Sequence, residues 1–140
     1  MLELNATNVR NEWSTVVDSV IREKPVIFKR TRDRMILSDI GFFSELLTAY
    51  NFNVRLFTED NGTITASLDE IDLVENGATE NEVKIKLAQS ILEYSEEYYN
   101  EFSFWSRGDR KAHIPYVFKA LILKDTDEIG RSFVCRHGEI

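Results

Sequence analysis

Hydrophobic positions recur with a helical period in the first part of the chain. After Thr7, the expected N-cap, apolar residues return at intervals of three and four. This spacing predicts one apolar stripe on a helix of about four turns, formed by Val9, Trp13, Val16, Val17, Val20 and Ile21. Pro25 is expected to end the helix, because proline cannot continue the helical hydrogen-bond ladder.

Two short β-prone runs follow, at residues 26–28 and 35–37. The polar, basic residues between them are expected to form a hairpin loop. Residues 2–4 are a possible first strand. A second helix, capped by Asp39, is expected over residues 40–50, with apolar side chains that close the core of a small β-α-β-β-α module.

The hydrophobic period changes from helical to alternating after residues 51–53. Val54 and Leu56 alternate on one side of Asn61 and Gly62, which are a strong hairpin signal, and Ile64, Ala66 and Leu68 alternate on the other side. A short strand over residues 71–74 and a turn at Asn76 and Gly77 are expected next. The sequence therefore predicts two domains, residues 1–50 and 51–140.

A long helix and a shorter one are predicted in the second domain. Thr79 and Glu82 form a capping box, and the helix that they open carries one apolar face, made of Val83, Leu87, Ile91, Tyr94, Tyr98 and Phe102. Pro115 suits the first turn of a helix whose residues 116–123 are apolar nearly all round, so that helix must be buried. Residues 125–140 show no clear period; they form either a terminal strand around residues 132–135 or a segment that becomes ordered on binding.

The charges are distributed unevenly. The chain has 140 residues, 43% of them hydrophobic, and a net charge of −7. Residues 1–50 contain seven basic and seven acidic residues, so the whole negative excess lies in residues 51–140. Five of the seven basic residues in the first part lie between Lys24 and Arg34. This asymmetry indicates a DNA-facing module joined to an acidic module that could meet a basic partner.

The sequence argues against a membrane or secreted protein. No apolar run approaches the length that spans a bilayer, and the N-terminus lacks the pattern of a signal peptide. Cys135 is the only cysteine, which excludes an intramolecular disulfide framework. A cytoplasmic protein is expected.

The beginning of the chain carries a recognisable order of motifs. A Thr-x-x-Arg sequence opens the first helix, a serine and a branched apolar row follow, and a Pro-Val-Ile strand leads into a basic hairpin; these are Thr7, Arg10, Ser14, Val16, Val17, Val20 and residues 25–30. Residues 1–50 thereby resemble the prevent-host-death (Phd/YefM) family of bacterial antitoxins. They depart from it at Trp13, where a smaller aliphatic residue is usual, and at the hairpin tip, which lacks the common glycine.

The element order of residues 51–102 resembles the partially open ribonuclease-H-like domain of HicB-type antitoxins. Together the two resemblances imply an α+β fold. A Phd/YefM-like module is expected first, followed by a small α+β domain, with antiparallel strands and a long helix, and by a C-terminal helix.

The resemblance to the Phd/YefM family implies a DNA-binding homodimer. In that family the arginine of the first helical turn and nearby basic residues contact operator DNA, a role that falls here on Arg10, Lys29, Arg30 and Arg32. The seam of the dimer is expected to contain Trp13, Val16, Val17 and Val20, because so short a module cannot bury its apolar surface alone. A basic hairpin that is only a solvated turn remains the alternative for the three hairpin residues.

The resemblance also implies a RelE/ParE-like toxin as partner. An acidic run with interleaved aromatic residues in the long helix suits a basic partner, because aromatic side chains anchor an interface and carboxylates steer it. The expected toxin-binding residues are Tyr94, Tyr98, Glu101, Phe102 and Trp105. An ordinary amphipathic helix explains the same pattern.

Enzyme signatures are missing from the sequence. Cys135 and His137 lack the third group that a catalytic pair or a metal site needs, and solvated hairpin ends explain the acidic residues near positions 59–60 and 69–72. We therefore expect no catalytic residue, no metal and no cofactor. The predicted function is that of an antitoxin that neutralises its toxin and represses its own operon; an immunity-type interaction protein that binds no DNA is the alternative.

Overall fold

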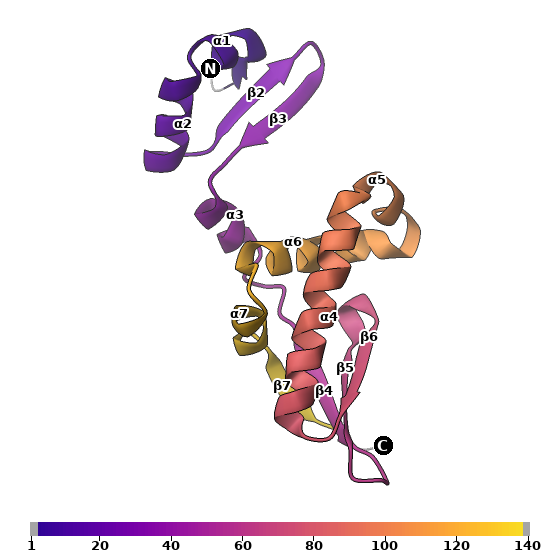
Figure 1. Cartoon of the computed structure of the whole chain (residues 1–140). Coiled ribbons are helices and arrows are strands. Elements are labelled where there is room, and N and C mark those ends of the chain that lie inside the picture. The colour runs from indigo at the N-terminus through magenta and orange to yellow at the C-terminus, as the bar shows by residue number, and fades with distance from the viewer. Residues whose placement is uncertain (1–2, 139–140) are drawn as a thin grey trace. The chain divides into compact units, whose positions relative to one another are not determined.

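The computed structural model describes residues 3–138 and divides the chain into two units, Met1–Leu46 and Leu47–Ile140 (Figure 1). The division lies close to the boundary expected from the change in hydrophobic period. Both units combine helices with a β-sheet, so the mixed α+β class is confirmed. No helix within residues 3–138 has the length and apolar character needed to cross a membrane.

The first unit contains a three-stranded sheet in the order β1-β2-β3. Strand β1 (Glu3–Asn5) runs parallel to β2 (Val26–Arg30), and β2 is antiparallel to β3 (Asp33–Leu37). Two helices, α1 (Ala6–Asn11) and α2 (Trp13–Arg22), connect β1 to β2. The short helix α3 (Ile40–Leu46) follows the sheet, and Asp39 is confirmed as its cap, because the Phe42 N–H donates to Asp39 Oδ1 at 2.8 Å.

The prediction of a single first helix is wrong, because two shorter helices occupy this part of the chain. The chain breaks at Glu12, and Asn5 rather than Thr7 caps α1 by accepting the Thr7 N–H at 2.7 Å. Arg10 consequently lies in the last turn of α1 instead of a first turn. The hairpin loop is also shorter than expected: only Thr31 and Arg32 connect the strands, because cross-strand pairing continues to the last residue of β2.

The core of the first unit is small. Four valines, at positions 9, 16, 20 and 26, are buried, and Phe28 and Leu37 pack against them. Helix α3 contributes no buried residue, and Ile40 and Leu46 are 62% and 59% exposed. The expectation that this helix closes the core is therefore wrong.

The second unit contains a four-stranded sheet in the order β6-β5-β4-β7. Strands β4 (Asn53–Thr58), β5 (Ile64–Leu68) and β6 (Leu73–Gly77) are antiparallel neighbours, and β7 (Val134–His137) runs parallel to β4. The hairpin predicted at Asn61 and Gly62 is confirmed, with Gly62 at a φ of +86°. The turn predicted at Asn76 and Gly77 is wrong: a 3-10 turn, η1 (Asp69–Ile71), precedes β6, and both residues belong to the strand.

Helix α4 (Glu80–Asn100) is the predicted long helix. Thr79 Oγ1 accepts the Glu82 N–H at 3.1 Å as the capping box requires, while the Glu82 carboxylate accepts the N–H of Ala78 instead of that of Thr79. The chain continues through α5 (Phe102–Trp105), η2 (Gly108–His113) and α6 (Ile114–Leu123), with proline in the first turn of α6 as predicted.

Sequence reasoning missed helix α7 (Thr126–Arg131). Asp125 caps it by accepting the N–H of Asp127 at 2.7 Å, and two acidic residues occupy its first turn. This local signal for a helix start was present in the sequence. The terminal strand exists, two residues later than expected.

Helix α4 holds the second unit together. It packs on β5 and β6, and α6 and α7 pack against it in turn (Figure 1). The core comprises twelve buried residues, which are Phe52, Val54, Leu56, Ala66, Leu68, Ile71, Val83, Leu87, Ala88, Ile91, Ala120 and Ile129. Two side chains of the apolar helix α6, Val117 and Ala120, are fully buried, because the helix lies between other elements of its own unit.

Candidate functional site

The basic residues of the first unit lie on two different elements. Arg10 lies in the last turn of α1, whereas Lys29 and Arg30 lie in β2 and Arg32 in the turn; all four side chains are exposed. Successive strand residues point to opposite faces of a sheet, so Lys29 and Arg30 do not share a face. The structure therefore does not gather the hairpin cations into one row.

The surface beside Arg10 has a feature that the sequence did not reveal. Helix α2 begins there without a side-chain cap, so backbone N–H groups remain available at its positively polarised end. A depression of ≈ 330 Å³ is lined by residues 10–15, including the Arg10 and Trp13 side chains. This end of α2 combines a guanidinium with uncapped amides, which is the chemistry that binds an anion.

Helix α2 carries two apolar stripes instead of one. Val16 and Val20 are 6% and 8% exposed and belong to the unit's own core, which leaves little of either side chain accessible to a dimer seam. A second stripe at four-residue spacing lies beside them: Trp13 is 53% exposed, Val17 is half-buried and Ile21 is 61% exposed. We call Trp13, Val17 and Ile21 the outer stripe.

Aromatic residues gather around the C-terminal end of α4. Tyr98 is fully buried, its hydroxyl donates to the Arg110 carbonyl at 2.6 Å, and its ring stacks on Trp105 with centroids 6.4 Å apart. The Arg110 guanidinium lies 4.4 Å from the Trp105 ring centroid. Residues of α5 and η2 therefore cover Tyr98, and its side chain has no exposed surface with which to contact a partner.

The other predicted aromatic residues have mixed exposure. Tyr94 and Trp105 are half-buried, and Phe102 is 37% exposed. Sequence reasoning did not single out the two most exposed rings, Tyr99 at 56% and Phe104 at 67%. Tyr99 lies in α4 and Phe104 in α5, and how far each ring is exposed depends on tertiary packing, which periodicity alone does not reveal.

A polar chain lies beneath this surface. The Tyr94 hydroxyl and His113 Nδ1 share a hydrogen bond of 2.6 Å, and His113 Nε2 lies 3.6 Å from Asp72 Oδ2. Burial raises the pKa of Tyr94 to about 12. Burial also lowers the pKa of His113, against the opposing effect of the Asp72 carboxylate. The neutral form of this histidine is therefore favoured, in a structural rather than an exposed position.

The acidic residues of α4 divide into two groups. In the first half, Lys84 pairs with Glu80 at 3.0 Å and Lys86 with Glu82 at 3.5 Å. In the second half and at the C-cap, four exposed glutamates have no ion-pair partner within residues 3–138; they are Glu93, Glu96, Glu97 and Glu101. We call these four residues the acidic row.

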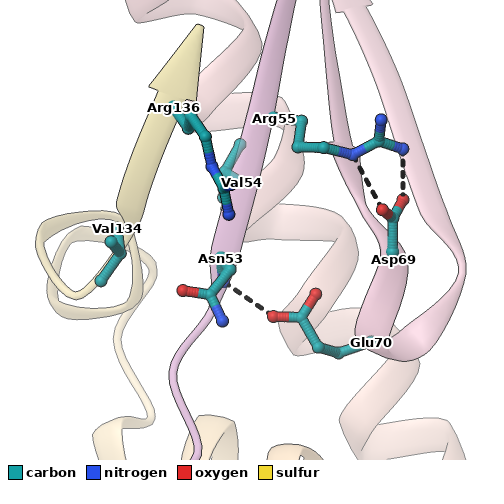
Figure 2. Close-up of a pocket in the computed structure, with 7 residues that line it drawn as sticks. All are labelled: Asn53, Val54, Arg55, Asp69, Glu70, Val134 and Arg136. Atoms are coloured by element: carbon teal, nitrogen blue, oxygen red, sulfur yellow. Dashed lines mark hydrogen bonds and ion pairs between the residues drawn. The ribbon is translucent and has the colours of Figure 1, made fainter. Parts of the chain in front are cut away.

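A cavity of ≈ 200 Å³ opens on the face of the second sheet opposite α4 (Figure 2). Asp69 receives two hydrogen bonds from Arg55, at 2.8 and 2.9 Å, and one from Ser67 at 2.7 Å. The Arg55 hydrogen bond, helped by Ser67, lowers the pKa of Asp69. Glu70 accepts the Asn53 N–H at 2.9 Å. Both carboxylates therefore hold the η1 turn against β4, which is a structural use of these acidic residues.

The other residues that could bind a metal ion or act as a nucleophile do not form a cluster. His137 Nε2 lies 3.3 Å from Glu80 Oε2, and Cys135 is an exposed free thiol. Across the part of the chain that the structure describes, no three His, Cys, Asp or Glu side chains are placed to hold a metal ion together.

Two comparisons with known proteins find relatives of this chain. The sequence model of the PHD-like family, described as the antitoxin of a RelE/RelB toxin–antitoxin system, matches residues 1–134. A crystal structure from Syntrophomonas wolfei subsp. wolfei, described as the antitoxin part of a proposed toxin/antitoxin system, has a TM-score of 0.91 and 35% sequence identity, and the match covers 99% of this chain and 100% of that chain. No curated protein matches the sequence.

Proposed function

Because the chain belongs to the PHD-like family of antitoxins from RelE/RelB toxin–antitoxin systems, we propose that it neutralises a RelE/ParE-like toxin by direct binding and represses its own operon as a DNA-binding homodimer. The observation that carries this proposal is the separation of charge. Among residues 3–138 the acidic row in the second unit has no ion-pair partner, while Arg10 and the hairpin cations are exposed in the first unit.

The toxin-binding surface that we propose differs from the expected one. It keeps Glu101, Phe102 and the exposed edges of Tyr94 and Trp105, loses Tyr98, and gains Tyr99 and Phe104. Exposed rings beside unpaired carboxylates suit a partner that presents both apolar pockets and cations.

Co-expression tests toxin neutralisation. The chain is expressed in bacteria together with the small protein encoded beside its gene, and growth is compared with that of cells expressing the small protein alone. We expect the chain to restore growth and to co-purify with its neighbour. Continued growth arrest, with both proteins present at normal levels, would refute the neutralising role.

The DNA-binding surface is proposed around Arg10. The uncapped N-terminus of α2 lies next to this side chain and can bind the same backbone phosphate. Lys29, Arg30 and Arg32 are the further DNA contacts that we propose on the hairpin, where Lys29 and Arg30 point to opposite faces of the sheet.

Electrophoretic titration of the upstream operator tests this surface. Arg10→Ala should weaken binding and lower the slope of log K against log salt by roughly 0.9, the value of one lost phosphate contact. Arg22→Ala, in the last turn of α2, removes the same charge elsewhere and should leave the slope unchanged. Equal slopes for wild type and Arg10→Ala would show that Arg10 contacts no phosphate. A wild-type chain that binds no operator would point to the immunity-type alternative.

The outer stripe is the proposed seam of the homodimer. Its occupant is the same stripe of a second copy, because a two-fold interface is self-complementary. Val17→Glu should convert a dimer into a monomer in sedimentation velocity, since it buries unpaired charges across the two-fold axis. Val74→Glu, at a 61% exposed position of β6, is the matched control. A monomeric wild-type chain at micromolar concentration would overturn this assignment.

A further inference from the structure

The two edges of the second sheet differ in how accessible they are. Strand β6 forms one edge, where Lys86 of α4 donates to the Asn76 carbonyl at 3.1 Å. A lysine at an edge strand discourages pairing with another chain. Strand β7 forms the other edge (Figure 1), and its residues Val134–His137 are all exposed. The sheet is therefore protected at one edge and open at the other.

Backbone groups of β7 point away from the sheet at alternate residues. The N–H groups of Val134 and Gly138 donate to carbonyls of the chain segment that contains β4, at 2.9 and 2.8 Å. The residues that bond to β4 thus alternate along β7, and the N–H and C=O groups of Cys135 and His137 point outward. Across residues 3–138 no side chain bonds these outward groups. They are ready to pair with a further strand.

The side chains of β7 indicate what such a strand would carry. Cys135 and His137 face α4 and contact charged side chains of that helix. Val134 and Arg136 lie on the opposite face and line the cavity there (Figure 2). Val134 is 52% exposed, and Arg136 has no ion-pair partner among residues 3–138. A complementary strand would bring an apolar side chain to Val134 and a carboxylate to Arg136.

A second copy of β7 fits this edge poorly. When both outward residues of one copy pair with those of an antiparallel second copy, Arg136 lies directly opposite its counterpart. Like charges in that position destabilise a strand pair. The charge of β7 therefore favours a strand of different sequence.

We propose that the free edge of β7 binds an extended segment of another protein, which adds a further strand to the second sheet and places a carboxylate opposite Arg136. Main-chain hydrogen bonds to Cys135 and His137 supply affinity, and the pair with Arg136 supplies specificity. His137 lies beside Glu80 at the start of α4. This edge is therefore distinct from the proposed toxin-binding residues near the other end of that helix.

A peptide titration tests strand addition. The probe is the fluorescein-labelled peptide Ser-Val-Thr-Glu-Thr-Val-Ser, and its binding to the full-length chain is followed by anisotropy. We expect saturable binding at concentrations up to about 1 mM. The same peptide with N-methylated threonines lacks the backbone donors that would face the edge and should not bind. Absence of binding by the first peptide, or equal binding by both, would overturn the inference.

Charge reversal tests the role of Arg136. Arg136→Glu should bind the glutamate peptide about threefold more weakly than wild type does, and should prefer a matched peptide with lysine at the central position. Arg107→Glu reverses another exposed charge of the second unit and should keep the wild-type preference. The same change of preference in both variants would mean that only net charge matters, and it would refute a specific pair with Arg136.

Amide hydrogen exchange locates the contact. In the free chain the amides of Cys135 and His137 should exchange rapidly, and the glutamate peptide should protect them. Cys135→Pro removes one outward donor without removing a bond to β4 and should weaken peptide binding, whereas Cys135→Ala should bind as wild type does. Peptide binding without this protection would place the peptide elsewhere, and protection in the free chain would show that two copies pair. Either result would contradict the proposal.

Discussion

Residues of similar chemistry have opposite roles in the second unit. Tyr98 and Tyr99 are neighbours in the sequence, yet Tyr98 is fully buried and Tyr99 is 56% exposed. The hydroxyl of Tyr98 is satisfied inside the unit by the Arg110 carbonyl. Only Tyr99 can therefore contact a partner without unfolding α5 and η2.

Thr31 occupies an unfavourable backbone conformation in the β2–β3 turn. Its φ is +58°, a region that costs a residue with a side chain roughly 1–2 kcal/mol. Thr31→Gly should therefore stabilise the first unit by up to about 1 kcal/mol, after glycine's own entropic cost. Urea unfolding measures the effect. Arg32→Gly, next along the turn but without a positive φ, should instead destabilise the unit; stabilisation by both changes would contradict the explanation.

His113 makes stability depend on pH. Its pKa is lowered by burial, with Arg110 acting in the same direction and Asp72 opposing it. The unfolded chain therefore takes up a proton more readily than the folded chain does. The stability that neutral His113 contributes to the folded state is fully present above the unfolded pKa of about 6.5. It is lost as the pH falls toward the pKa of His113 in the folded state.

Urea unfolding between pH 7.5 and pH 5.5 checks this linkage. We expect wild type to lose stability over this window and His113→Gln to lose less. An identical pH dependence for wild type and His113→Gln would show that another group causes it.

At the scale of elements, helix ends decide where side chains lie. The break at Glu12 ends α1 and begins α2, which places Arg10 beside an uncapped helix start. Helix α2 then divides its apolar residues between the core and the outer stripe. A continuous helix would have placed Arg10 elsewhere relative to Trp13.

The cap of α4 gives a prediction at this scale. Thr79→Ala removes the acceptor of the Glu82 N–H and should destabilise the second unit by about 1 kcal/mol. Thr126→Ala changes the first residue of α7, whose cap is Asp125, and should cost less. Urea unfolding followed by circular dichroism measures both. Equal losses of stability would indicate that lost packing, rather than the cap, causes the effect.

At the scale of the whole molecule, the two units differ greatly in buried core. The first unit buries four valines in its cluster and the second buries twelve residues. Small domains with little buried area are marginally stable unless a partner completes them. The first unit should therefore depend on self-association and the second should not.

The two tryptophans report on the units separately, because Trp13 belongs to the first unit and Trp105 to the second. In the Trp105→Phe variant, Trp13 fluorescence reports on the first unit. Its thermal midpoint should be lower than that of the second unit and should rise with protein concentration. In the Trp13→Phe variant, Trp105 fluorescence should change at a higher temperature that is independent of concentration. Coincident midpoints at every concentration would show that the chain unfolds as one cooperative body.

Local signals in the sequence were sufficient for much of the fold. The Asp39 and Thr79 caps, the turn at Gly62 and the proline of α6 are decided by residues a few positions apart, and the structure contains all four. The uneven charge of the two parts is also a property of the sequence alone. Such features need no distant contact, because a cap or a tight turn satisfies its own backbone groups.

Only the tertiary structure decided which apolar and charged residues are accessible. The period of α2 marks an apolar side, but the core of the first unit takes in only part of it, so Val16 and Val20 are buried while Trp13 and Ile21 are not. The acidic row is recognisable as a run of glutamates, yet its lack of ion-pair partners within the part of the chain that the structure describes depends on where the lysines and arginines lie. Burial and ion pairing are set by residues far apart in the sequence, and a local pattern therefore identifies the element but not the face that remains free to bind.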